Sequence, residues 1–145
     1  MKRVALFLLL LTLAAASFAQ VRKLPENPEE KYTSALFRST NAYALLPEND
    51  PLAISSFNVF QYIQGRIPGL MIYSAGTPTP AVLYRMGVPV LFLDEVRVSA
   101  EMLAAVNMSD IAYIKVFRPP FTGSFGGANG AIAVYTKKGE EEGDE

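Results

Sequence analysis

Residues 111–136 read IAYIKVFRPPFTGSFGGANGAIAVYT, and this stretch decides the fold. Ile111, Tyr113, Lys115 and Phe117 alternate with Ala112, Ile114 and Val116, and apolar residues almost fill 131–136. This is the pattern of two strands with at least one buried face. Two prolines end the first strand, because proline has no N–H to donate to a sheet. The Asn-Gly pair at 129–130 tolerates positive φ and turns the chain into the second strand.

Shorter strand and helix signals precede this stretch. Further strands are predicted at 70–73, 81–86 and 90–98. Ser55 or Ser56 is expected to cap a helix that runs to about Gln64, and Ser99 is expected to cap a second helix. Two helices among several short strands predict a small α+β domain of two layers, with a short mixed β-sheet.

The chain opens with the pattern of a secretory signal peptide. Lys2 and Arg3 make a basic start, residues 4–16 are an almost unbroken apolar run, and small residues precede Gln20. The run of about 13 residues is shorter than the roughly 20 that a membrane-spanning helix needs. We therefore expect residues 1–19 to be a cleaved signal peptide, with no transmembrane segment in the mature chain.

The remainder of the chain divides into three parts. Residues 20–52 are predicted to be an N-terminal linker rich in proline and glutamate, in which only 32–46 has a weak helical pattern. Residues 53–139 hold the regular structure and form the predicted domain. Residues 140–145 carry five acidic side chains and are predicted to be a disordered acidic tail.

The composition excludes several classes of function. The chain has no His and no Cys, so it cannot form a Ser-His-Asp or Cys-His triad, a zinc site of the usual ligands, or a disulfide. Its 13 Lys and Arg nearly balance 14 Asp and Glu, and they are not clustered as in a nucleic-acid-binding surface. We predict no catalytic residue, no metal ligand, no cofactor and no nucleic-acid partner, and hence no enzyme.

Two polar features could still carry chemistry. The glycine-rich loop 123–130 lacks the spacing and the lysine of a phosphate-binding loop, and a strand rather than a helix follows it, so a turn is favoured. Asp94 and Glu95 are adjacent, and consecutive strand residues point to opposite faces, so a strand end or a turn is favoured over acid–base catalysis. Lys115 and Arg118 are interpreted as solvated or paired charges.

Four blocks of the sequence resemble a known family. They are VFQYIQGRIPGL at 59–70, VLYRMG at 82–87, PVLFLD at 89–94, and DIAYIKV at 110–116 together with GGANGAI at 126–132 and TKKG at 136–139. In this order they resemble the plug domain of TonB-dependent outer-membrane receptors, especially the Bacteroidetes starch-utilisation type.

The resemblance implies structural roles, in shaping turns and helix ends, for the residues that match the family's motifs. These are Gln64, Gly65, Arg66, Pro68, Gly69, Gly87, Asp94, Gly126, Gly127, Ala128, Asn129, Gly130, Lys137, Lys138 and Gly139. The chain departs from the family at Glu95, where glycine is usual, so the turn after Asp94 is expected not to need positive φ.

In that family the plug lies inside a large barrel, and we expect this chain to lack one because only six residues follow Gly139. The resemblance then implies a non-enzymatic, stand-alone plug-like module of outer-membrane transport that acts through protein contacts, or a truncated receptor. The alternative is a periplasmic binding or adaptor domain that reuses the fold. An exposed apolar patch around Phe117, Phe121 and Phe125 would favour protein partners in either case.

The expected location is the periplasm or the periplasmic face of the outer membrane, with a barrel or a lipoprotein as partner. Export is the first testable prediction. Because small residues stand at the end of the apolar run, mass spectrometry of the protein from its own host should find Gln20 at the N-terminus. A cytoplasmic product that retains Met1 would contradict the prediction.

Overall fold

The computed structural model describes residues 27–39, 41–74, 79–121 and 126–137. The predicted signal peptide, the acidic tail, Lys138, Gly139 and Phe125 lie outside the described residues. Within them the elements follow in this order: α2 (Pro28–Tyr32), η2 (Ala35–Phe37), β1 (Ala42–Leu45), η3 (Pro47–Asn49), α3 (Pro51–Ile54), α4 (Val59–Ile63), β2 (Leu70–Tyr73), β3 (Ala81–Tyr84), β4 (Val90–Leu93), β5 (Val96–Arg97), α5 (Ala100–Ala104), η4 (Met108–Asp110), β6 (Ile111–Phe117) and β7 (Ala131–Thr136).

The predicted α+β class with a mixed sheet is confirmed. Five strands pair in the order β1-β6-β7-β4-β5, and β2 and β3 form a separate antiparallel pair. The contact between β4 and β7 is parallel, whereas β6 pairs with both β1 and β7 in antiparallel fashion. The two strands predicted at 111–118 and 131–136 thus lie side by side within the five-stranded sheet, and all seven residues of β6 are buried.

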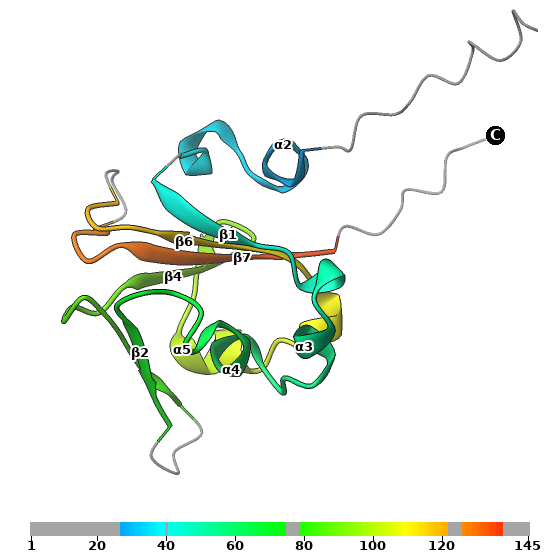
Figure 1. The fold of residues 1–145 in the computed structure, drawn as a ribbon. Coiled ribbons are helices and arrows are strands. Elements are labelled where there is room, and N and C mark those ends of the chain that lie inside the picture. The colour runs from blue at the N-terminus through cyan, green and yellow to red at the C-terminus, as the bar shows by residue number, and fades with distance from the viewer. Residues whose placement is uncertain (1–26, 40, 75–78, 122–125, 138–145) are drawn as a thin grey trace, which may run out of the picture.

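Both faces of the five-stranded sheet are covered (Figure 1). Helices α3, α4 and α5 lie on one face, and α2 and η2 lie on the other. The first face carries the larger apolar core, which includes Phe60, Ile63 and Leu103. The second face carries an aromatic core around Phe37 and Phe92. The order of layers is therefore N-terminal segment, sheet, helices.

The prediction of a linker is wrong for residues 27–39 and 41–52, which are the part of 20–52 that the structure describes. Residues 27–52 contribute α2, η2, β1, η3 and α3, and β1 extends the sheet by pairing with β6. Phe37 is 1% exposed. The proline-rich pattern did exclude long helices, and these helices are short. However, it could not show that short turns and one strand would be held by contacts to β6, which is distant in the sequence.

The single strand predicted at 90–98 is a hairpin of two strands. Asp94 and Glu95 turn the chain between β4 and β5 with φ of 47° and 69°. A two-residue hairpin turn of this type needs positive φ at both positions because its twist must match that of the strands. The expectation that Glu95 avoids positive φ is therefore wrong. The strand predicted at 81–86 also ends early, at Tyr84, because Arg85 and Met86 adopt positive φ.

Two further expectations, on the cap of the first helix and on an apolar patch, are wrong. Helix α4 begins at Val59 with Asn58 as its cap, whereas Ser55 and Ser56 end α3 by donating to the Leu52 carbonyl. Ser99 caps α5 as predicted.

The second expectation concerns Phe117 and Phe121, which do not form the exposed apolar patch considered from the sequence. They are 1% and 8% exposed and belong to the aromatic core. The local sequence cannot tell which face of the sheet a distant segment will cover.

The burial of Phe37 generates a prediction about the N-terminal segment. Phe37→Ala should lower the free energy of unfolding by about 3–5 kcal/mol, because it leaves a cavity among buried rings. The neighbouring Leu36 is 73% exposed and serves as the matched control. Leu36→Ala should change stability by less than about 0.5 kcal/mol. Urea unfolding measures both, and equal effects would mean that residues 27–39 behave as the linker first expected.

Candidate functional site

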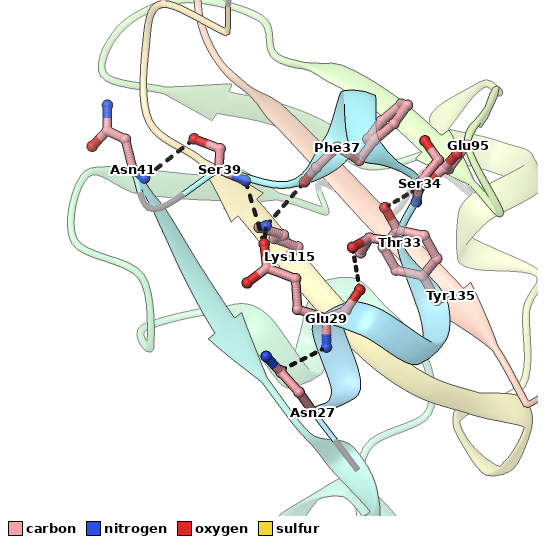
Figure 2. A network of polar contacts seen from close by, with 10 residues as sticks. All are labelled: Asn27, Glu29, Thr33, Ser34, Phe37, Ser39, Asn41, Glu95, Lys115 and Tyr135. Atoms are coloured by element: carbon pink, nitrogen blue, oxygen red, sulfur yellow. Dashed lines mark hydrogen bonds and ion pairs between the residues drawn. The ribbon is translucent and has the colours of Figure 1, made fainter.

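A buried lysine joins the N-terminal segment to the sheet. Lys115 is on β6 and is only 2% exposed. Its Nζ donates to the Phe37 carbonyl at 2.9 Å and forms an ion pair with the Glu29 carboxylate (Figure 2). An ammonium ion removed from water needs such partners, since an unpaired buried charge is very unfavourable. The sequence left open whether Lys115 is a solvated or a paired charge. In the structure it is a paired charge.

The same carboxylate orders the segment that covers the lysine. Glu29 also accepts from the Ser39 N–H at 3.3 Å, and its backbone carbonyl accepts from the Thr33 hydroxyl. Asn27 caps α2 by accepting from the Glu29 N–H at 3.1 Å. We call residues 27–39 the N-terminal strap. Sequence reasoning missed its role, and the one available signal was a lysine inside an otherwise apolar strand.

Aromatic packing supplies the apolar part of the strap contact. The Phe37 ring lies 5.1 Å from that of Phe92, 6.0 Å from that of Phe117 and 5.6 Å from that of Phe121, measured between centroids. Edge-to-face and tilted pairs at these distances are favourable beyond the area that they bury. The strap therefore closes a face that would otherwise expose several large rings.

The turn at Asp94 and Glu95 is fixed from two sides. Asp94 accepts from the N–H and the hydroxyl of Thr136 at 2.9 and 2.8 Å, which ties the hairpin to β7. Glu95 accepts from the Ser34 N–H at 2.6 Å and from the Tyr135 hydroxyl at 3.4 Å. The family-motif residue Asp94 thus holds the turn to β7, and Glu95 attaches the strap.

A hollow of about 500 Å³ lies between this turn and the strap. Burial raises the pKa of Tyr135, and the neighbouring Glu95 carboxylate raises it further. Burial raises the pKa of Tyr113 on the same face to about 12. Both phenols therefore stay protonated at neutral pH, and the Tyr135 hydroxyl remains a hydrogen-bond donor to Glu95.

Three of the motif glycines, Gly69, Gly87 and Gly130, lie close together at a second place in the structure. A Cβ on Gly87 would lie 2.1 Å from the Asn129 side chain, and a Cβ on Gly130 would lie 2.5 Å from the Phe117 carbonyl and 2.9 Å from the Tyr84 ring. Gly69 accepts from the Arg85 N–H at 2.8 Å and has φ of +82°. We call this the glycine junction. It joins the β2–β3 pair to the loop before β7, and backbone contacts this close need glycine.

The helix-exit motif forms a third structural cluster. Arg66 Nη1 lies 2.7 Å from Asp50 Oδ2, which also accepts from the Tyr62 hydroxyl at 3.1 Å. The Arg66 guanidinium lies over the Tyr62 ring at 4.3 Å. The Leu52 N–H, followed by Tyr62 and Arg66, lowers the pKa of Asp50, although partial burial opposes them. Arg66 therefore connects α4 to the segment before α3, which the sequence analysis had placed in a linker.

The other motif residues are dispersed. Gln64 ends α4, Gly65 follows with φ of +76°, and Pro68 lies in the turn before β2. Gly126, Gly127 and Ala128 lie in the loop before β7, where the Gly127 carbonyl accepts from the Phe121 N–H at 2.8 Å. Lys137 Nζ lies 3.4 Å from Glu48 beside a second hollow of about 530 Å³.

The described residues contain no group of three or more Asp, Glu, His or Cys placed to hold a metal ion. Among the helices in the described ranges, none is long and apolar enough to cross a membrane. Polar side chains at the Lys115–Glu29 pair, the Asp94–Glu95 turn and the Arg66–Asp50 pair form hydrogen bonds and ion pairs that hold backbone segments in place.

Neither a scan against protein-family models nor a search of curated proteins gave a match. Solved structures do match. A chain of the RagAB peptide importer in the closed-closed state is 22% identical with a TM-score of 0.53, and the match covers 73% of this chain and 13% of that chain. The siderophore receptor PirA from Acinetobacter baumannii is 19% identical with a TM-score of 0.53, over 69% of this chain and 18% of the receptor.

A third match is the ferric enterobactin receptor PfeA from Pseudomonas aeruginosa, 18% identical with a TM-score of 0.53, over 70% of this chain and 18% of that one. This chain thus spans less than a fifth of each of these three structures. At these identities the likeness shows the fold. The chain has a plug-like α+β fold that occurs as a segment of TonB-dependent outer-membrane receptors.

The glycine junction generates a prediction with an internal control. Gly130→Ala should destabilise the protein by about 2–5 kcal/mol, because it combines strained φ with a clash against backbone and ring atoms. Gly126 also has positive φ, but its Cβ would meet nothing within 4 Å. Gly126→Ala should therefore cost only about 1–2 kcal/mol. Thermal or urea unfolding measures the loss of unfolding free energy in both variants. Equal losses would show that close contacts at Gly130 do not require glycine.

The Lys115–Glu29 ion pair generates a double-mutant prediction. Glu29→Gln should cost about 1–3 kcal/mol, less than a fully buried pair because the Glu29 side chain is partly exposed. In the Lys115→Met background the same change should cost much less, because no buried charge remains to be paired. Urea unfolding of the four proteins gives the coupling energy. Additive effects would show that the pair does not act as a unit.

Proposed function

We propose that this chain is a non-enzymatic plug-like module of outer-membrane TonB-dependent transport that acts through protein contacts. The observation that carries the proposal is the fold, which matches a segment of an importer and of siderophore receptors over about 70% of the chain. The motif glycines support it, because Gly69, Gly87 and Gly130 meet at one junction although they are far apart in the sequence.

The surface beside the glycine junction offers a contact region for a partner. Met86 and Val88 are 83% and 69% exposed in the turn between β3 and β4. Exposed apolar side chains on one turn are suited to contact another protein. The partner in this proposal is a protein of the outer membrane, either a barrel or a lipoprotein component.

Export belongs to the same proposal. The N-terminal sequence supports a cleaved signal peptide, and the outer-membrane receptors among the structural matches support a location in the cell envelope. The module would then be in the periplasm or on the periplasmic face of the outer membrane.

The alternative is a periplasmic binding or adaptor domain that uses the plug-like fold without a barrel. One observation favours it. The N-terminal strap already covers the aromatic face, with Phe37 buried and Lys115 paired, so the domain closes this face without a partner. A fold does not by itself fix a function, so the two candidates must be separated by experiment.

Site-specific photo-crosslinking in the native host separates them. A photoreactive residue at Met86 should give an adduct that sediments with the outer membrane and contains a barrel or lipoprotein, identified by mass spectrometry. The control position is Leu36, which is exposed on the strap and should give much less of that adduct. Adducts found only in the soluble periplasmic fraction would support the adaptor, and a cytoplasmic protein would contradict both proposals.

A further inference from the structure

One edge of the five-stranded sheet is open. Strand β1 is the first strand in the sheet order and pairs only with β6 on one side. Ala44 is exposed, and the other three residues of β1 are partly exposed. The opposite edge is β5, which has only two residues. Short edge strands are a common protection against pairing with other chains, whereas β1 is a longer edge.

The pairing pattern fixes which backbone groups of β1 face outward. The Arg118 N–H donates to the Asn41 carbonyl at 3.0 Å, and Ala42 and Ala44 stand opposite Phe117 and Lys115. In an antiparallel ladder hydrogen-bonded pairs alternate with pairs that are not. Since Asn41 and Arg118 are a hydrogen-bonded pair, the N–H and C=O groups of Ala42 and Ala44 point away from β6.

No hydrogen bond from these outward groups to another described residue occurs in the structure. Native edge strands are usually protected by a lysine, a proline or a bulge. The four residues of β1 are Ala, Tyr, Ala and Leu, and their pairing with β6 has no register shift. The edge can therefore accept an added strand without rearrangement, and small side chains at 42 and 44 allow close approach.

A cation lies beside this edge. The Arg118 guanidinium lies over the Tyr43 ring at 4.5 Å, and its Nε is buried without a hydrogen-bond partner. None of the ion pairs among the described residues includes Arg118. Side chains alternate between faces along a strand, so Tyr43 and Arg118 share one face. An acidic residue on that face of an added strand would lie near the guanidinium and could pair with it.

We propose that β1 is a docking edge for an extended segment of a partner protein. The segment adds to the sheet as a sixth strand through the backbone of Ala42 and Ala44. It places an acidic side chain on the face of Arg118. Backbone pairing supplies the affinity and the arginine supplies the preference for an acidic sequence. The inference rests on Ala42, Ala44 and Arg118 and not on Met86 or Val88, so it stands or fails independently of the proposed function.

Synthetic peptides test the proposal on the full chain. The first probe is an acetylated, amidated heptapeptide of alternating threonine and valine with a central glutamate. The second has lysine in place of the glutamate, and the third is the glutamate peptide with alternate backbone nitrogens methylated. In ¹⁵N NMR titrations, the glutamate peptide should shift the Ala42 and Ala44 amides and bind about tenfold more tightly than the lysine peptide. The methylated peptide should not bind, because it lacks the donors.

Protein variants provide matched controls. Ala44→Pro removes one outward donor and leaves the pairing with β6 intact, so it should abolish binding of the glutamate peptide. Ala44→Ser keeps the donor and should bind as the unchanged protein does. Circular dichroism checks that both variants are folded. The methylated peptide gives the same comparison on the unchanged protein, so the test does not depend on a folded proline variant.

Several results would overturn the proposal. Shifts that avoid Ala42 and Ala44, or equal binding of the methylated peptide, would exclude strand addition. A dimer that is lost in Ala44→Pro would assign the edge to a second copy of this chain. Binding that requires deletion of residues 138–145 would assign it to the chain's own tail. Equal affinity for the glutamate and lysine peptides would remove the role of Arg118.

Discussion

The structure depends on how a lysine is buried within a strand of the sheet. The ammonium group of Lys115 needs an anion and further acceptors once it leaves water, and the strap provides both through Glu29 and the Phe37 carbonyl. The strap cannot leave without exposing the lysine and the rings that pack against Phe37. One ion pair therefore couples the N-terminal segment to the sheet and makes residues 27–39 part of the domain.

Close backbone contacts are the second constraint. The glycine junction brings together segments that a side chain of any size would keep apart, and Gly130 shows this most clearly. Two other turns place residues other than glycine at positive φ. Arg85, Met86, Asp94 and Glu95 all adopt positive φ, and pairing of the adjacent strands offsets the local strain. The Asp94 turn is held further by its bonds to Thr136.

These constraints concern how segments distant in the chain are held together. Its polar groups hold segments together, and its buried tyrosines remain neutral because desolvation raises their pKa values. Met86 and Val88 remain exposed on the turn before β4, and β1 remains an edge of the sheet with one strand neighbour.

The sequence by itself determined the α+β class, the β2, β6 and β7 strands and the Ser99 cap, since periodicity and capping depend on near neighbours in the chain. It also identified the residues of the glycine junction through the family resemblance, but not that they meet. Only the tertiary structure decided that residues 27–52 belong to the fold, that Phe117 and Phe121 are covered, and that Lys115 is buried. The physical reason is distance along the chain: Glu29 and Lys115 are 86 residues apart, and no local pattern encodes a contact of that separation.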